Sequence, residues 1–118
     1  MGKIEKFELL GWIWFRNTKI SDKGITGKYL FFSNNRRRLI HLARRILKEK
    51  SLPSAKINIK NEGKGFVLCV YDTRPKLKDK LKEYADFKEI HYRYWKSDKD
   101  TIEGRYSNEF LNNLPLKK

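Results

Sequence analysis

The sequence predicts an α+β domain in which helices pack on one face of a curved antiparallel sheet. Short stretches with strand-like alternation come in pairs joined by turn signals, and segments with helical periodicity separate these pairs. The length of 118 residues suits a single domain, so one domain is expected over residues 1–118. A ferredoxin-like βαββαβ arrangement of residues 28–96 is the alternative.

Aromatic strands are expected at the start of the chain. The first is predicted over residues 7–16, with Trp12, Trp14 and Arg16 on one face. A polar loop with a turn signal follows, and the second strand is expected over residues 29–32.

A long helix is expected next, over residues 35–49. Ser33 and the two following Asn residues can cap its start, and Pro53 prevents its continuation. Apolar residues at spacings of three and four form its buried side, namely Leu39, Leu42, Ala43, Ile46 and Leu47.

The remaining elements repeat this pattern of hairpin and helix. In the strand expected over residues 55–60, Ile57 and Ile59 should lie inside, and the polar residues outside are Lys56, Asn58 and Lys60. The elements expected after it are a buried strand over residues 66–71, a helix starting near Thr73, a strand over residues 87–96 and a short helix over residues 108–113.

The strand over residues 87–96 mixes aromatic rings and cations on both faces. Simple alternation puts His91, Arg93 and Trp95 on one face and Tyr92, Tyr94 and Lys96 on the other. Rings next to cations suit a flat or anionic ligand, whereas the structural alternative is that the rings are core and the cations are solvated.

The charge of the chain is its strongest functional signal. Lys and Arg number 28 against 14 acids, which gives a formal net charge of +14. This excess costs self-repulsion, so we expect a polyanionic partner: nucleic acid first, then an acidic protein. No signal peptide or membrane-spanning run is visible, so an intracellular, cytoplasmic protein is expected. The Lys-, Ile- and Asn-rich composition is typical of an AT-rich genome, such as that of a thermophilic archaeon or its virus.

The expected helix carries most of the candidate nucleic-acid contacts. Its basic residues lie at spacings of three, four and seven or beside the helix start: Arg36, Arg37, Arg38, His41, Arg44, Arg45 and Lys48. A solvated surface is the alternative interpretation, but a structural helix would interleave acids, and only Glu49 is present. A further candidate is Trp12 or Trp14, which could stack a base, with Arg16 on the same face. The last strand adds the group Arg93, Trp95 and Lys96.

A family resemblance rests on the segment Tyr92-Arg93-Tyr94-Trp95-Lys96 followed by Asp98, Thr101, Gly104 and Tyr106. With weaker agreement from residue 27 onward, it resembles the basophilic leukaemia-expressed protein family, whose archaeal members carry a phosphothreonine lyase domain label. That family is similar in fold to translation initiation factor 4E, which implies an antiparallel sheet with helices on one side. No motif places Trp12, Trp14 or Trp95 at the cap-binding positions of that factor, so its cap site is not carried over.

The lyase label supplies the main alternative function, an enzyme acting on a phosphorylated substrate. β-Elimination needs a base, an acid and a phosphate-binding cation. Lys28, His41, His91 and Lys96 could serve as base or acid and Arg93 could bind the phosphate, and the set chosen is Lys96, Arg93 and His91. A binder of an acidic protein is a third hypothesis. No metal site or cofactor is expected, because two His and the lone Cys69 do not form one and the nearest acids, Asp98, Asp100 and Glu103, suit loop capping.

Overall fold

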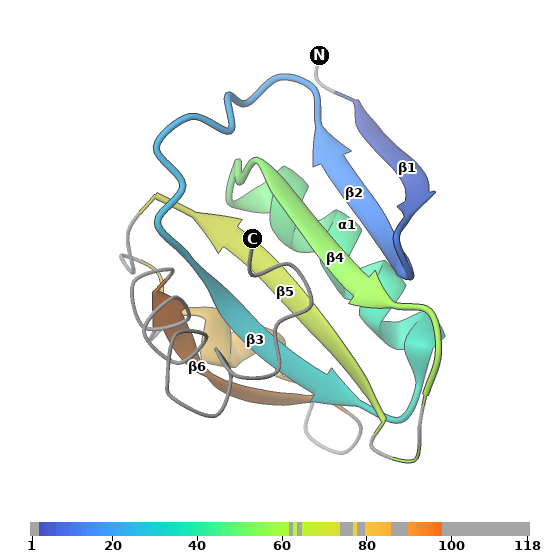
Figure 1. Ribbon diagram of the computed structural model, residues 1–118. Helices are drawn as coiled ribbons and strands as arrows, with labels where there is room; N and C mark the ends of the chain where they lie inside the picture. Colours follow the sequence, from blue (N-terminus) through green and yellow to red (C-terminus); the bar gives the residue numbers. More distant parts are fainter. Residues whose placement is uncertain are drawn as a thin grey trace, which may run out of the picture.

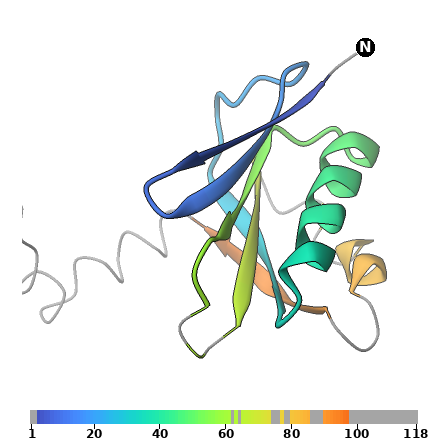
Figure 2. The same cartoon turned by 90° about the vertical axis from the view of Figure 1, so that its right-hand side faces the viewer.

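The computed structural model describes residues 3–61, 63, 65–73, 77, 80–85 and 90–97. These residues form a curved six-stranded antiparallel sheet with a long helix on one face (Figure 1). In the side view, a short 3-10 helix lies on the same side of the sheet as the long helix (Figure 2). The α+β class and the one-sided placement of helices are therefore confirmed.

The elements follow the expected alternation. They are β1 (Ile4–Leu9), β2 (Trp12–Asn17), β3 (Gly27–Ser33), α1 (Arg36–Glu49), β4 (Ser54–Asn58), β5 (Phe66–Asp72), the 3-10 helix η1 (Lys80–Tyr84) and β6 (His91–Ser97). The strand order in the sheet is β1-β2-β4-β5-β3-β6, and every neighbouring pair is antiparallel. From β3 to β6 the order of elements is βαββαβ, with β5 inserted between β3 and β4. The strands β1 and β2 extend this unit beyond β4.

The single strand expected over residues 7–16 is wrong, because the chain reverses there and forms the β1–β2 hairpin. Leu10 and Gly11 both have positive φ, at 51° and 85°. Two central residues with positive φ are what a tight hairpin turn requires. The prediction missed the turn because residues 7–15 are almost all apolar and Leu-Gly is a weak turn signal.

The helix α1 is as predicted. The side chain of Asn35 caps its start by accepting a hydrogen bond from the backbone N–H of Arg38 at 3.2 Å. Its buried residues are the predicted five: Leu39, Leu42, Ala43, Ile46 and Leu47. They pack against the inward-facing side chains of the sheet, which include Ile13, Phe15, Tyr29, Phe31, Ala55, Ile57, Leu68 and Val70.

One buried polar pair lies in this core. The Tyr29 hydroxyl donates to the Asp72 carboxylate at 2.7 Å and accepts a hydrogen bond from the backbone N–H of Leu77 at 3.1 Å. Burial, followed by the hydrogen bond with Asp72, raises the pKa of Tyr29, so this phenol stays protonated. The pair joins β3, β5 and the segment that leads to η1.

The alternation expected over residues 55–60 is confirmed for the strand β4, which ends at Asn58. Ile57 is buried, Ile59 is half-buried just beyond the strand, and Lys60 is exposed. The prediction that Lys56 and Asn58 are exposed is only partly right, because both are half-buried. Their side chains are on the face opposite α1, where neighbouring side chains shield them.

The simple alternation expected for the last strand is wrong. The register of β6 against β3 shifts between Leu30 and Phe31, so that Leu30 pairs with Tyr94, Phe31 pairs with Tyr92, and Arg93 is skipped. This bulge brings Tyr92 and Trp95 to the same side of the sheet although their positions differ in parity. Both pack against the core, Tyr92 on Phe31 and Trp95 on Tyr29.

Other expected elements lie partly or wholly outside the described residues. Where a helix was expected to start near Thr73, the described part shows η1, in which Leu81 is buried. The short helix expected over residues 108–113 and the first residues of the strand expected over 87–96 lie outside the described residues. Within the described part, neither helix has the length and apolar composition needed to cross a membrane.

Candidate nucleic-acid interface

The candidate nucleic-acid contacts fall on opposite sides of the sheet. One set lies on α1, and the other lies on the face of the sheet that α1 and η1 leave uncovered among the described residues (Figures 1 and 2). We call the second surface the open sheet face. It carries Phe7, Trp12, Trp14, Arg16, Lys28, Lys56, Tyr71 and Lys96. One ligand contact area therefore cannot include Trp12 and Arg44 together, as the expected set of residues implied.

The basic residues of α1 differ in their surroundings. Arg37, His41, Arg44 and Lys48 are exposed and follow one another at four, three and four residues, which places them in a single line along the helix. We call this line the outer stripe. None of the described acidic side chains lies within ion-pair distance of the outer stripe. Arg44 also lies over the Phe15 ring, at 5.4 Å from its centroid.

Arg36 has a structural role. Its guanidinium donates to the backbone carbonyl of Ile59 at 2.9 Å and lies 5.6 Å from the centroid of the Phe66 ring. These contacts tie the start of α1 to the β4–β5 connection. Arg36 is therefore a poor candidate for a phosphate contact, contrary to the prediction.

Arg45 belongs to a small cluster with Glu49 and Tyr84. The Arg45 guanidinium pairs with Glu49 at 3.4 Å and lies over the Tyr84 ring at 5.0 Å, and the Tyr84 hydroxyl donates to Glu49 at 2.6 Å. Partial burial and the hydrogen bond with Glu49 raise the pKa of Tyr84 to about 12. The hydrogen bond from Tyr84, followed by that from Arg45, lowers the pKa of Glu49. The cluster connects α1 to η1, so part of the Arg45 charge is already balanced.

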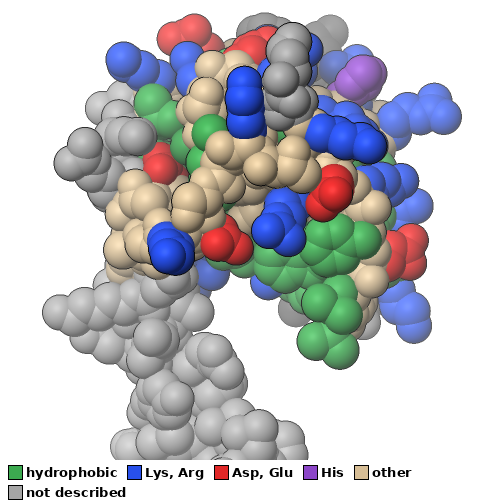
Figure 3. Space-filling model, turned by 90° about the horizontal axis from the view of Figure 1, so that it is seen from above, with side chains coloured by type: hydrophobic (Ala, Val, Ile, Leu, Met, Phe, Trp, Pro, Cys, Tyr) green, Lys and Arg blue, Asp and Glu red, His purple; other side chains and the backbone are tan. Residues whose placement is uncertain are grey.

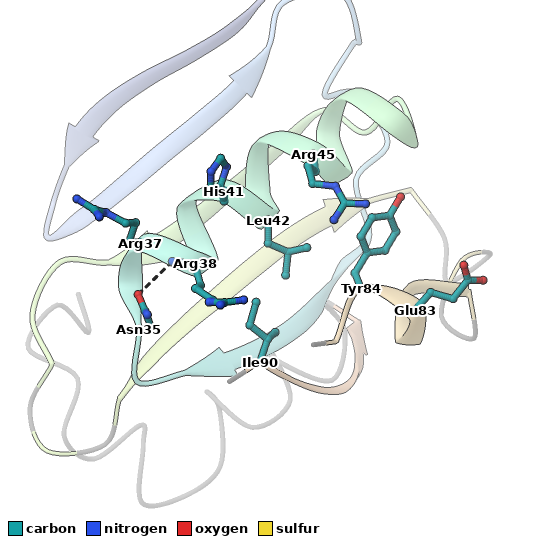
Figure 4. A pocket seen from close by; sticks show the side chains of 9 residues that line it. All are labelled: Asn35, Arg37, Arg38, His41, Leu42, Arg45, Glu83, Tyr84 and Ile90. Carbon is teal, nitrogen blue, oxygen red and sulfur yellow. Dashed lines mark hydrogen bonds between the residues drawn. The ribbon is translucent and has the colours of Figure 1, made fainter. Parts of the chain in front are cut away.

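A cleft of about 560 Å³ separates α1 from η1. Leu42, Tyr84 and Ile90 form its apolar part, and its charged or polar lining consists of Asn35, Arg37, Arg38, His41, Arg45 and Glu83. Figure 4 shows Arg38 and Arg45 extending toward the η1 side, whereas Arg37 and His41 point away from it. The cleft thus has excess positive charge, consistent with an anionic ligand on this side of the molecule.

On the open sheet face, three aromatic rings form a row across the sheet. Phe7 of β1 and Trp14 of β2 are direct cross-strand partners, and their rings are nearly parallel, with 6.4 Å between centroids and 9° between planes. Trp14 and Tyr71 of β5 are also nearly parallel, at 5.9 Å and 13°. Figure 3 shows hydrophobic side chains gathered on the β1–β2 side of the molecule next to Lys and Arg side chains.

Lys56 of β4 lies among these rings. Its ammonium is 4.0 Å from the Trp12 centroid, 5.2 Å from that of Trp14 and 6.0 Å from that of Tyr71. Burial, and to a smaller extent the like charge of Lys28, lowers the pKa of Lys56, while Cys69 opposes this shift. No carboxylate among the described residues pairs with Lys56. A half-buried cation held by ring faces alone is suited to an incoming anion.

Other cations flank the ring row. Lys28 lies 5.9 Å from the Tyr71 centroid, and Lys96 of β6 is its direct cross-strand partner. At the opposite side of the row, Arg16 is exposed and pairs across the strands with Glu5. Glu5 is the one acidic residue that the strand register places on the described part of this face. Positive charge therefore surrounds the rings on the open sheet face.

The group expected on the last strand is divided by the bulge. Trp95 is half-buried and packs on Tyr29 at the core, with 4.8 Å between ring centroids, so it is a poor candidate for a contact with nucleic acid. Arg93 is exposed and lies over the Phe32 ring at 5.1 Å, while Lys96 stays on the open sheet face.

The candidate catalytic residues do not converge. His91 and Lys96 lie near opposite ends of β6, about 16 Å apart along an extended strand. His41 lies on α1, on the other side of the sheet. The described residues thus bring no imidazole to Lys96, and the arrangement that β-elimination needs is missing from this part of the chain.

Cys69 is a free, buried thiol, and burial raises its pKa. Among the described residues, no group of three or more His, Cys, Asp or Glu side chains could hold a metal ion.

Sequence reasoning missed Phe7, Lys56 and Tyr71 as site residues. Alternation within β4 already placed Lys56 on the face opposite Ile57, but nothing local shows that β4 lies between β2 and β5. The site depends on this non-local pairing of strands.

The chain matches no protein-family model, no curated protein and no solved structure.

Proposed function

We propose that the protein binds nucleic acid, mainly through contacts with the phosphate backbone, and that it does so in the cytoplasm. The net charge of +14 supports this proposal, because it adds self-repulsion to a folded chain without aiding its packing. A polyanion relieves that repulsion, and condensed counterions released from nucleic acid favour binding.

The outer stripe is the observation that carries the proposal. Arg37, Arg44 and Lys48 are exposed on one line of a rigid helix, and His41 lies between them. The first turn of α1 contains no acidic residue, although acids there would stabilise the helix. Like charges at these spacings destabilise a helix, so the outer stripe lowers the stability of α1. The same exposed cations can bind phosphate groups.

A charge-matched pair of double variants tests the outer stripe. In the first, Arg37→Ala is combined with Lys48→Ala, and neither side chain lies in the core. In the control, Lys19→Ala is combined with Lys23→Ala in the exposed loop between β2 and β3. Both double variants have the same net charge, so any difference between them reflects position.

We expect the logarithm of duplex affinity to fall linearly with the logarithm of salt concentration. Loss of two phosphate contacts should flatten that slope by about 1.8 in the outer-stripe variant and leave the control slope unchanged. The loss should be equal for unrelated sequences, because phosphate contacts do not read bases. Equal slopes for the two folded variants would place the binding surface away from α1.

A further inference from the structure

We infer that the open sheet face binds unpaired bases, so that the nucleic acid recognised there is single-stranded. This inference rests on the proposed function and concerns a surface separate from the outer stripe. The residues that carry it are Phe7, Trp14 and Tyr71, with Lys56 between the last two.

The spacing of the ring row fits a short run of nucleotides. Phe7, Trp14 and Tyr71 belong to β1, β2 and β5, with β4 in between, so the row crosses three interstrand gaps of the sheet. The ring centroids follow one another at 6.4 Å from Phe7 to Trp14 and 5.9 Å from Trp14 to Tyr71. A sheet surface with aromatic side chains on neighbouring strands stacks about two or three bases in other single-strand binders.

The cations are placed where the phosphates of such a strand would need them. Lys56 lies within 6.0 Å of three ring centroids, and Lys28 lies 5.9 Å from that of Tyr71. Bases on the rings would bring phosphates to these ammonium groups. The structure thus offers stacking and charge neutralisation on one surface, which is the combination that single strands require.

Exposure also favours a ligand on this face. Phe7 is 42% exposed, and Trp12, Trp14 and Tyr71 are half-buried instead of packed under α1. A duplex keeps its base faces stacked inside the helix, so only unpaired bases can reach the rings. An acidic protein would supply carboxylates to the lysines, whereas unpaired bases would also supply flat rings that stack on Phe7 and Trp14.

The experiment compares a short oligo(dC) strand with an abasic strand of the same length and charge. The native protein should bind oligo(dC) about 5- to 100-fold more tightly, since base–ring stacking supplies the difference. Trp14→Leu should reduce this preference, because it removes the central ring of the row. Phe7→Ala, at an exposed edge position, should reduce the preference even if Trp14→Leu fails to fold. Leu10→Ala is the control, because Leu10 is an exposed apolar residue of the same hairpin outside the ring row.

The outcomes separate this inference from the proposed function. Either of two results would overturn the base-binding inference and leave phosphate binding in place. One is that the native protein binds oligo(dC) and the abasic strand with equal affinity. The other is that folded Trp14→Leu and Phe7→Ala keep the native preference for oligo(dC). If the protein binds neither strand and no duplex at low salt, both the base-binding inference and the proposed function are overturned. Tighter binding to poly-glutamate than to oligo(dC), with the same dependence on Trp14, would assign the surface to an acidic protein instead.

Discussion

At the scale of single residues, Lys56 shows how position changes the chemistry of a common side chain. Its ammonium lies against the rings of Trp12 and Trp14 with no described carboxylate as partner. Burial favours the neutral amine, so the pKa of Lys56 is lower than that of an exposed lysine. Lys56 therefore loses its proton at a lower pH than an exposed lysine would.

The first prediction concerns the pH dependence of binding. Affinity of the native protein for oligo(dC) should begin to fall before the ordinary lysine pKa of about 10.4 is reached, because the pKa of Lys56 is lowered. Lys56→Arg keeps its charge throughout this range and should retain its affinity to higher pH. Fluorescence titration at fixed ionic strength measures the effect. Coinciding pH profiles for the two proteins would show that Lys56 does not contact the ligand.

The second prediction concerns the buried hydroxyl of Tyr29. Tyr29→Phe removes its hydrogen bonds to Asp72 and to the backbone of Leu77 and leaves the buried carboxylate less satisfied. The free energy of unfolding should fall by about 1.5–3 kcal/mol. Tyr84→Phe is the matched control, because its hydroxyl bonds to Glu49 at the surface and its loss should have a smaller effect. Urea denaturation compares the two, and equal losses would refute a special role for the buried pair.

At the scale of elements, the local sequence pattern predicts the type of element and its buried residues correctly where the element has one polar face. The helix α1 and its buried residues follow from spacing alone, and β4 follows from alternation. The β1–β2 turn and the bulge in β6 were not predictable in this way. The turn falls within an apolar run, and the bulge depends on pairing with β3, which is distant in sequence.

The third prediction concerns the hairpin turn. Leu10 has a φ of 51° and is 88% exposed, so it gains little from burial and adopts a conformation that branched or bulky residues disfavour. Leu10→Asn should raise the free energy of unfolding by about 1 kcal/mol, because Asn followed by Gly is preferred in this turn. Gly11→Ala, at a φ of 85°, should lower it by a similar amount. Thermal unfolding that ranks the two variants in the opposite order would contradict this account of the turn.

At the scale of the whole molecule, the sheet separates two surfaces of different chemistry. The outer stripe offers charge on a rigid helix, and the open sheet face offers rings together with charge. Helical periodicity predicted the stripe from the sequence. The ring row could not be predicted, because it brings β1, β2 and β5 together through the strand order of the sheet. The pairing of β6 with β3 places Trp95 beside Tyr29, on the side of the sheet opposite Trp12.

The most direct test of nucleic-acid binding is the affinity of the native protein for random single-stranded and duplex oligonucleotides over a series of salt concentrations. With Arg37, Arg44 and Lys48 on phosphates, the duplex slope of log affinity against log salt should be about −2.7 or steeper. Single strands should show a similar electrostatic decline and a base-dependent component that remains at high salt. Absence of binding at low salt, or an affinity that does not change with salt, would contradict the account.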